Sequence, residues 1–154
     1  MKPSNSSRGR GIHIIDDIND LNVDDLSIIS RYVTNPLLIN GYKFDLRIYV
    51  VVTCYEPLRI YVYKEGLARF ASETYTAKFN KNNKYMHLTN YSINKKNDNF
   101  VQNESSENDD FGFKWSLSAF CKHLETVGIN MSLLWSRIFD VFIKTLACGE
   151  HYVL

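Results

Sequence analysis

The stretch 43–53 places the strongest constraint on how this chain can fold. β-branched and aromatic residues dominate it and turn-forming residues bound it, which predicts a β-strand. Side chains alternate between the two faces of a strand, so one face should belong to the core and carry Phe44, Leu46, Ile48 and Val50. The opposite face should carry three charges spaced about 7 Å apart, those of Lys43, Asp45 and Arg47.

These alternating charges admit two interpretations. They could form the solvated face of an antiparallel sheet, with ion pairs between neighbouring strands. They could instead line the wall of a pocket for a charged ligand, because charges are costly to bury unless they are paired or bound.

Composition indicates a single soluble globular domain. The chain has 154 residues, of which 45% are hydrophobic and 23% charged. No apolar run reaches the length of a membrane span, and the first residues lack the apolar core of a signal peptide, so we expect no membrane association. The three cysteines have neither zinc nor disulfide spacing and predict free thiols in a reducing compartment: Cys54, Cys121 and Cys148.

Charge is unevenly distributed although the net charge is only +1. The stretch 74–97 contains no acid and five lysines, namely Lys78, Lys81, Lys84, Lys95 and Lys96. The first fifteen residues are also free of acids and carry Lys2, Arg8 and Arg10. Acids gather instead at 16–25 and 104–110. Basic stretches attract anionic partners, although lysines on an ordinary solvated surface would give the same pattern.

The remaining patterns predict an α+β fold, with a mostly antiparallel sheet followed by two C-terminal helices. Further strands are expected at 11–15, 27–33, 58–63 and 67–70. Turns should lie at Asn35–Pro36, Asn40–Gly41, 55–57 and Glu65–Gly66. The segment 78–110 is expected to be irregular, with a mobile acidic tip at 104–110.

Two apolar stripes at helical spacing predict the helices. The first contains Leu117, Phe120, Cys121, Leu124 and Val127. Ser116 is its expected N-cap and Gly128 its expected end. The second begins with Leu134, Trp135, Ile138, Val141, Phe142 and Thr145 and should end near Gly149.

Three short motifs could carry chemistry. The loop 6–11 combines glycines, whose amides can approach phosphate closely, with arginines that pair with phosphate, although a disordered or RNA-binding arginine-glycine segment would look similar. The segment 87–92 is dense in short hydrogen-bonding side chains, which an Asn/Ser turn would also explain, and His87 is expected to be structural. Arg69 lies in an apolar strand, where it could hold a carboxylate or pair with an acid such as Glu73.

Seven segments, taken in order, resemble the tubulin tyrosine ligase-like family and specifically its glutamate-adding branch, the tubulin polyglutamylases. They are Lys2–Pro3, Arg8–Ile12, Ser30–Ile39, Lys43–Val50, Gly66–Ala71, Met86–Asn97 and Lys114–Ser116. The resemblance implies an ATP-grasp catalytic domain that forms an amide bond at the expense of ATP. It also implies an ATP-dependent ligase that adds glutamate to glutamate side chains in tubulin tails.

The resemblance assigns a role to each matching position. ATP binding is implied for Lys2, Arg8, Gly9, Ser30, Arg31, Tyr32, Val33, Lys43, Asp45, Thr89 and Asn90. Arg47 would face the transferring phosphate or the acceptor carboxylate and is the expected catalytic residue. The incoming free L-glutamate would be held by Arg69, Ser92 and Lys114, and cationic groups suit its two carboxylates.

The implied reaction has two steps. ATP phosphorylates the side-chain carboxylate of a glutamate in an acidic tubulin tail, and the amine of free glutamate then attacks the acyl phosphate. The products are an isopeptide branch, ADP and phosphate, and Mg²⁺ neutralises the phosphates. Expected partners are tubulin tails or microtubules, with no nucleic acid and no membrane. A cytoplasmic, cytoskeletal monomer is expected, with the cilium or basal body as an alternative location.

Departures from the family pattern limit what the chain alone should do. Family members continue before Lys2 into an N-terminal lobe and beyond Leu154 into a magnesium-binding segment, so residues 1–154 should be the central part of an incomplete catalytic domain. No metal ligand is expected among its own acids, and Ser30 replaces a glutamine found in many relatives. We therefore expect the isolated chain to be inactive as a ligase. The alternatives are a non-catalytic nucleotide- or tail-binding module and, third, RNA binding by the arginine-glycine loop.

Overall fold

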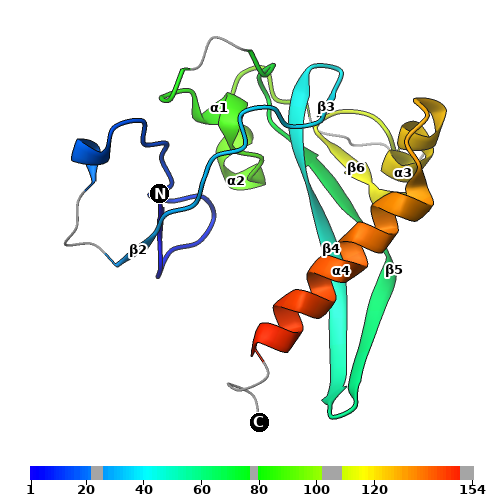
Figure 1. Cartoon of the computed structure of the whole chain (residues 1–154). Helices are drawn as coiled ribbons and strands as arrows, with labels where there is room; N and C mark the ends of the chain where they lie inside the picture. The colour runs from blue at the N-terminus through cyan, green and yellow to red at the C-terminus, as the bar shows by residue number, and fades with distance from the viewer. Residues whose placement is uncertain (22–25, 77–79, 102–108, 150–154) are drawn as a thin grey trace. The chain divides into compact units, whose positions relative to one another are not determined.

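The computed structural model describes residues 1–21, 26–76, 80–101 and 109–149. The architecture is α+β, with antiparallel pairing at β1–β2 and β3–β4 and two helices at the C-terminal end, as expected (Figure 1). The chain divides into two compact units, one formed by residues 1–45 and 68–114 and the other by residues 46–67 and 115–154.

A long hairpin carries the predicted charged strand. β4 (Tyr42–Tyr55) and β5 (Leu58–Phe70) are the central strands of a four-stranded sheet with the order β3-β4-β5-β6. β3 (Leu38–Ile39) pairs antiparallel with β4 across the predicted Asn40–Gly41 turn, where both residues have positive φ. Exposure alternates along β4 from residue 47 to residue 53, which confirms the expected two-faced strand.

The predicted turn at Glu65–Gly66 is wrong, because β5 continues through it without interruption. A Cβ atom added at Gly66 would lie 2.4 Å from the backbone oxygen of Arg47. Gly66 therefore permits a close approach of two backbones inside the sheet, which is a common role of glycine within a strand.

The N-terminal segment contains less strand than predicted. β1 (Lys2–Pro3) and β2 (Ser27–Ile28) form a two-stranded sheet, and a 3₁₀ turn covers Ile18–Asp20. Residues 11–15 form no strand, and their backbone meets the chain start through hydrogen bonds between His13 and Met1. The predicted strand 27–33 ends at Ile28, since the apolar side chains that suggested it remain mostly exposed at Ile28, Ile29 and Val33.

The segment predicted to be irregular contains two single-turn helices, α1 (Lys84–His87) and α2 (Tyr91–Asn94). Asn83 caps α1 by accepting hydrogen bonds from the amides of Tyr85 and Met86. Asn94 is 1% exposed and its side chain joins α2 to Leu88 and Ser72. The asparagines that suggested a loop thus satisfy backbone groups internally. Lys78 and most of the predicted acidic tip, residues 104–108, lie outside the described residues.

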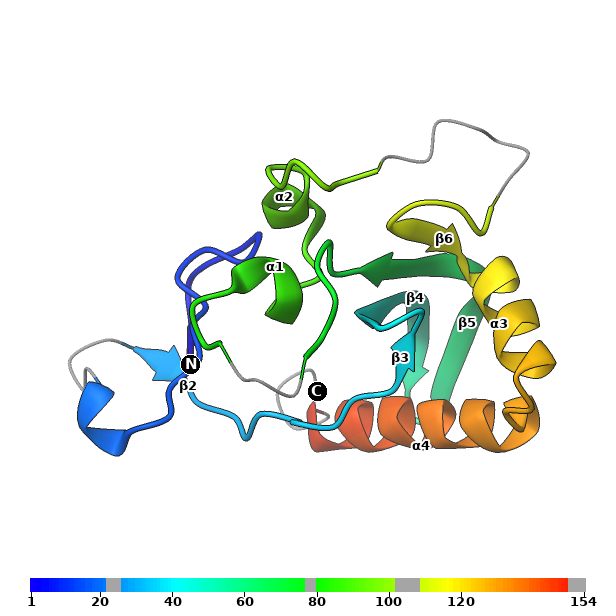
Figure 2. The same cartoon turned by 90° about the horizontal axis from the view of Figure 1, so that it is seen from above.

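Both predicted C-terminal helices are present. α3 (Leu117–Thr126) follows β6 (Lys114–Ser116) directly (Figure 2). The side chain of Ser116 accepts a hydrogen bond from the amide of Ala119 and is the N-cap of α3. Gly128 ends this segment with a φ of 82°. The buried face of α3 carries Leu117, Phe120 and Leu124.

α4 (Met131–Gly149) is the longest helix, and its predicted apolar stripe is only partly covered. Leu134, Trp135, Ile138 and Phe142 are half-buried, whereas Val141 and Thr145 are exposed. Within the described part of the chain, no helix is both long enough and apolar enough to cross a bilayer. The three cysteines are free thiols, as expected.

Candidate functional site

Lys43 is half-buried in a cluster of polar groups from three separate segments. Its ammonium donates hydrogen bonds to the backbone oxygen of His87 (3.0 Å) and to the hydroxyl of Tyr32 (3.3 Å). The ammonium also lies 4.7 Å from the centroid of the Tyr32 ring, in cation–π distance. Burial lowers the pKa of Lys43, against the opposing effect of the Asp45 carboxylate. The structure therefore brings together Lys43 and Tyr32, two residues that the sequence assigned to one nucleotide site.

His87 completes this cluster and its tautomer follows from its partners. Nε2 lies 2.9 Å from the backbone oxygen of Asn80, and Nδ1 lies 2.8 Å from the hydroxyl of Tyr32. Because a carbonyl oxygen only accepts, Nε2 carries the proton and Nδ1 of the neutral ring accepts from Tyr32. Burial, reinforced by the Lys43 charge and opposed by the Asn80 hydrogen bond, lowers the pKa of His87. Burial likewise raises the pKa of the Tyr32 hydroxyl.

Asp45 and Arg69 form a two-pronged ion pair across β4 and β5. The Arg69 Nε donates to Asp45 Oδ1 at 2.8 Å, and Nη2 donates to Oδ2. The partner of Arg69 named from the sequence, Glu73, instead accepts hydrogen bonds from Asn83 and Asn97. The cross-strand ion pair that the sequence left as one alternative is thus present at this position.

The predicted phosphate-binding loop packs against the segment around α2. Arg8 and Gly9 have φ angles of 59° and 77°, and the backbone oxygen of Arg8 accepts a hydrogen bond from the Ser92 hydroxyl at 2.9 Å. A Cβ atom at Gly9 would lie 2.3 Å from Cδ1 of Ile93 and 3.0 Å from Oδ1 of Asn90. Four residues selected from the sequence, Arg8, Gly9, Asn90 and Ser92, therefore lie together.

A basic pocket of about 630 Å³ opens between this loop and the segment 81–96. Its lining includes no acidic residue and six arginines and lysines, namely Arg8, Arg10, Lys81, Lys84, Lys95 and Lys96. Such a concentration of one sign of charge favours a ligand with several negative charges.

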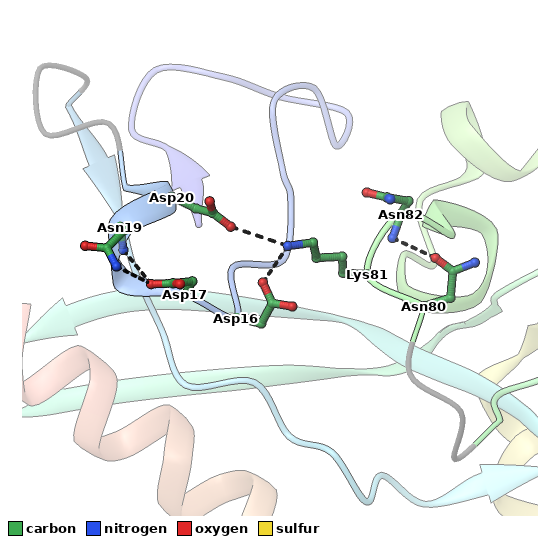
Figure 3. A network of polar contacts seen from close by, with 7 residues as sticks. All are labelled: Asp16, Asp17, Asn19, Asp20, Asn80, Lys81 and Asn82. Carbon is green, nitrogen blue, oxygen red and sulfur yellow. Dashed lines mark hydrogen bonds and ion pairs between the residues drawn. The ribbon is translucent and has the colours of Figure 1, made fainter.

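Lys81, in the lining of this basic pocket, forms ion pairs with two acidic residues. Its ammonium lies 2.5 Å from a carboxylate oxygen of Asp16 and 3.3 Å from one of Asp20, which joins the segment 16–20 to the loop before α1 (Figure 3). The hydrogen bond that Lys81 donates to Asp16 lowers the pKa of Asp16, and the hydrogen bonds that it donates to Asp16 and Asp20 raise the pKa of Lys81. Asp17 caps the 3₁₀ turn beside them by accepting from the Asn19 amide.

The other residues selected from the sequence differ in exposure. Lys2, in β1, and the three hinge residues Ser30, Arg31 and Val33 are exposed, and the segment 30–33 is not a strand. Arg47 is exposed and belongs to the second compact unit. Lys114 is exposed at the start of β6, while Thr89 is 9% exposed in the link between α1 and α2.

Comparisons with known proteins decide the family. The Tubulin-tyrosine ligase family profile matches residues 1–153. The chain belongs to the tubulin-tyrosine ligase family. It is 46% identical to tubulin polyglutamylase TTLL5 of Mus musculus over 97% of this chain and 11% of that protein. It is 47% identical to tubulin polyglutamylase ttll-5 of Caenorhabditis elegans over 99% of this chain and 21% of that protein.

A third relative, the tubulin monoglutamylase TTLL4 of Mus musculus, is 46% identical over 99% of this chain and 13% of its own length. The chain thus spans between about a tenth and a fifth of the length of these relatives. The family is ATP-grasp-like, in agreement with the fold class expected from the sequence.

The residues present fit a polyphosphate but not, by themselves, a metal ion. Half-buried Lys43 and the basic pocket supply the cations that an anionic phosphate chain requires. Among the described residues, no three His, Cys, Asp or Glu side chains gather closely enough to hold a metal.

Sequence reasoning missed the contribution of His87 to the Lys43 cluster. A lone histidine in a polar segment carries no local signal for a contact with a tyrosine 55 positions earlier in the chain. Its position directly before the segment 88–90, which contains two residues assigned to ATP, was the available hint.

Proposed function

We propose that this chain forms part of an ATP-dependent ligase that adds L-glutamate to side-chain carboxylates of glutamates in tubulin tails. The family match over residues 1–153 and the polyglutamylase and monoglutamylase names of its relatives support this proposal. The observation that carries it is the arrangement around Lys43 and Asp45. Both side chains are half-buried. Lys43 donates a hydrogen bond to Tyr32, and Asp45 accepts one from Arg69; the family pattern assigns Tyr32 and Arg69 to substrate binding.

Each step of the proposed reaction requires groups of this chain to bind and orient anions. The γ-phosphoryl group of ATP passes to a tail carboxylate, and the free glutamate amine then forms the C–N bond while phosphate leaves with the C–O bond electrons and the amine loses a proton. Lys43 and Arg8 would bind phosphate oxygens, Asp45 the nucleotide, and Arg47 the transferring group. Ser92, Lys114 and Arg69 would hold the carboxylates of free glutamate. This contribution is positioning and charge stabilisation.

A segment exchange tests this function. The region of C. elegans ttll-5 that matches this chain would be replaced by residues 1–154, and incorporation of labelled glutamate into tubulin would be measured. We expect incorporation by the exchanged protein, loss with Arg47→Ala, and none by the 154-residue chain alone. An exchanged protein that is folded and binds ATP yet incorporates no glutamate would contradict the proposal.

The basic pocket favours a second candidate, a non-catalytic module that binds acidic tails. Binding of a glutamate-rich tail peptide should then weaken steeply as salt rises, and Lys84→Glu with Lys96→Glu should abolish it. Peptide binding by the 154-residue chain together with an inactive exchanged protein would favour this candidate over the ligase.

A further inference from the structure

Tyr32, His87 and Lys43 form one continuous chain of hydrogen bonds whose directions are all fixed. The Asn80 carbonyl accepts from Nε2 of His87, Nδ1 of His87 accepts from the Tyr32 hydroxyl, and the oxygen of that hydroxyl accepts from Lys43. Lys43 donates a second hydrogen bond to the backbone of His87. Two of the three N–H bonds of the ammonium are thus directed by Tyr32 and His87.

This chain of contacts joins three segments that the family pattern assigns to ATP. Tyr32 belongs to the predicted adenine hinge 30–33, Lys43 lies on β4, and His87 ends α1 just before Thr89 and Asn90. His87 is only 3% exposed, so its neutral ring is built into the protein interior. A part-buried network with several directed hydrogen bonds fixes the position of a charged group more narrowly than a single contact can.

We propose that Tyr32 and His87 are positioning residues that hold the Lys43 ammonium in the geometry required for the phosphates of ATP. This inference rests on the proposed function, since it presupposes that Lys43 binds ATP. It assigns His87 a role that depends on its neutral form. Protonation would place a donor at Nδ1 facing the Tyr32 hydroxyl and a second positive charge beside Lys43.

Groups from several elements face His87. Lys43 faces it from β4, the hydroxyl of Tyr32 lies on Nδ1, and the Tyr75 ring packs edge-on at 6.1 Å. Lys81 and Lys84, from the loop before α1 and from α1 itself, line the same basic pocket as His87. Burial and the Lys43 charge disfavour the protonated ring and outweigh the hydrogen bond to the Asn80 carbonyl, which favours it, so the pKa of His87 is lowered.

The test measures ATP affinity of the 154-residue chain and of matched variants. Tyr32→Phe retains the ring beneath the Lys43 ammonium but removes the hydroxyl, and we expect about tenfold weaker ATP binding because a hydrogen bond to a charged group is lost. Tyr42→Phe removes the hydroxyl of the residue that precedes Lys43 on β4; its side chain belongs to the other face of the strand and packs against Phe113, so this change should alter the affinity less than about twofold.

Three further readouts separate positioning from a general loss of structure. His87→Leu should weaken ATP binding as Tyr32→Phe does, His87→Asn should restore part of it, and the double variant should be no weaker than the weaker single variant. The pKa of His87 is lowered in the folded chain, so wild type should lose additional affinity only at a pH below the ordinary titration range of histidine, and this loss should disappear in His87→Asn. Nitrogen chemical shifts of the His87 ring should report the Nε2–H tautomer, and thermal unfolding should show that every variant is folded.

The outcomes distinguish this inference from the proposed function. If the wild-type chain binds ATP and folded Tyr32→Phe and His87→Leu bind it equally well, the positioning role is refuted and the proposed function stands. If the wild-type chain does not bind ATP, the nucleotide assignment of Lys43 fails, and the inference fails with it. A pH profile that is the same for wild type and His87→Asn would remove the requirement for a neutral ring.

Discussion

Breaking the Asp45–Arg69 ion pair should reveal how strongly β4 and β5 are tied together in the first compact unit. The Arg69 side chain is 21% exposed and that of Asp45 is 39% exposed, with two hydrogen bonds between them. Buried hydrogen bonds to charged groups contribute roughly 1.5–3 kcal/mol each, whereas exposed ion pairs contribute about 0.2–1 kcal/mol. The intermediate exposure, discounted for solvent screening, leads us to expect a coupling energy of about 1 kcal/mol.

The single substitution Arg69→Ala should cost more than this coupling energy. It removes the packing of the arginine stem and leaves a half-buried carboxylate without its partner, so we expect a loss of about 2 kcal/mol in the free energy of unfolding. The measurement is urea unfolding of wild type, Asp45→Ala, Arg69→Ala and the double variant, at low salt and at about 1 M salt.

A matched control is available on α4, where Asp140 and Lys144 form an exposed ion pair one turn apart. The same cycle there should give a coupling energy of about 0.3 kcal/mol, which high salt should remove. A coupling energy at Asp45–Arg69 no larger than that of the α4 pair would refute the argument that this pair is a structural link across the sheet.

Three further predictions follow from particular contacts. Gly66→Ala should destabilise the chain by more than about 2 kcal/mol in urea unfolding, since its Cβ would lie 2.4 Å from the Arg47 backbone oxygen, whereas Gly128→Ala, with no neighbour within 4 Å, should cost only about 1 kcal/mol of backbone strain. Equal costs would contradict a steric role for Gly66. Gly9→Ala should destabilise by about 2 kcal/mol, and Ile93→Ala in the same chain should recover part of that loss; additive losses would disprove the close packing. The pKa of His87 is lowered in the folded state, so the unfolded chain takes up more protons as the pH falls below about 6.5 and the free energy of unfolding should decrease in that range. His87→Leu should flatten this pH dependence. An unchanged slope would contradict the burial of a neutral ring.

The sequence was sufficient for those features whose cause is local. Alternation of apolar and charged residues predicted β4, and apolar spacing with the Ser116 cap and Gly128 predicted α3, because each signal lies within the element it specifies. The strand predicted at 11–15 failed for the opposite reason. β-branched residues form a strand only when another strand or a core is available to them, and the hydrogen bonds that His13 exchanges with Met1 do not extend into a strand at 11–15.

Long-range contacts decided the parts of the site that sequence reasoning did not predict. The sequence left the partner of Arg69 open, with a ligand carboxylate and a nearby acid such as Glu73 as alternatives, and pairing across the sheet places it at Asp45. Gly66 suggested a turn because sequence alone does not distinguish a glycine needed for a turn from one needed for a close backbone approach. The family pattern identified Lys43 and Tyr32 together, but only the three-dimensional arrangement adds His87 between them.

The close packing of Gly9 against Ile93 and Asn90 has a practical consequence for engineering in this family. A loop whose backbone rests this closely on another segment is not an independent module, and its shape depends on the side chains beneath it. Grafting residues 8–11 from a relative should therefore succeed only when positions 90 and 93 are exchanged at the same time. Substitutions in the glycine-rich loop 8–11 and substitutions at positions 90 and 93 should therefore be designed together.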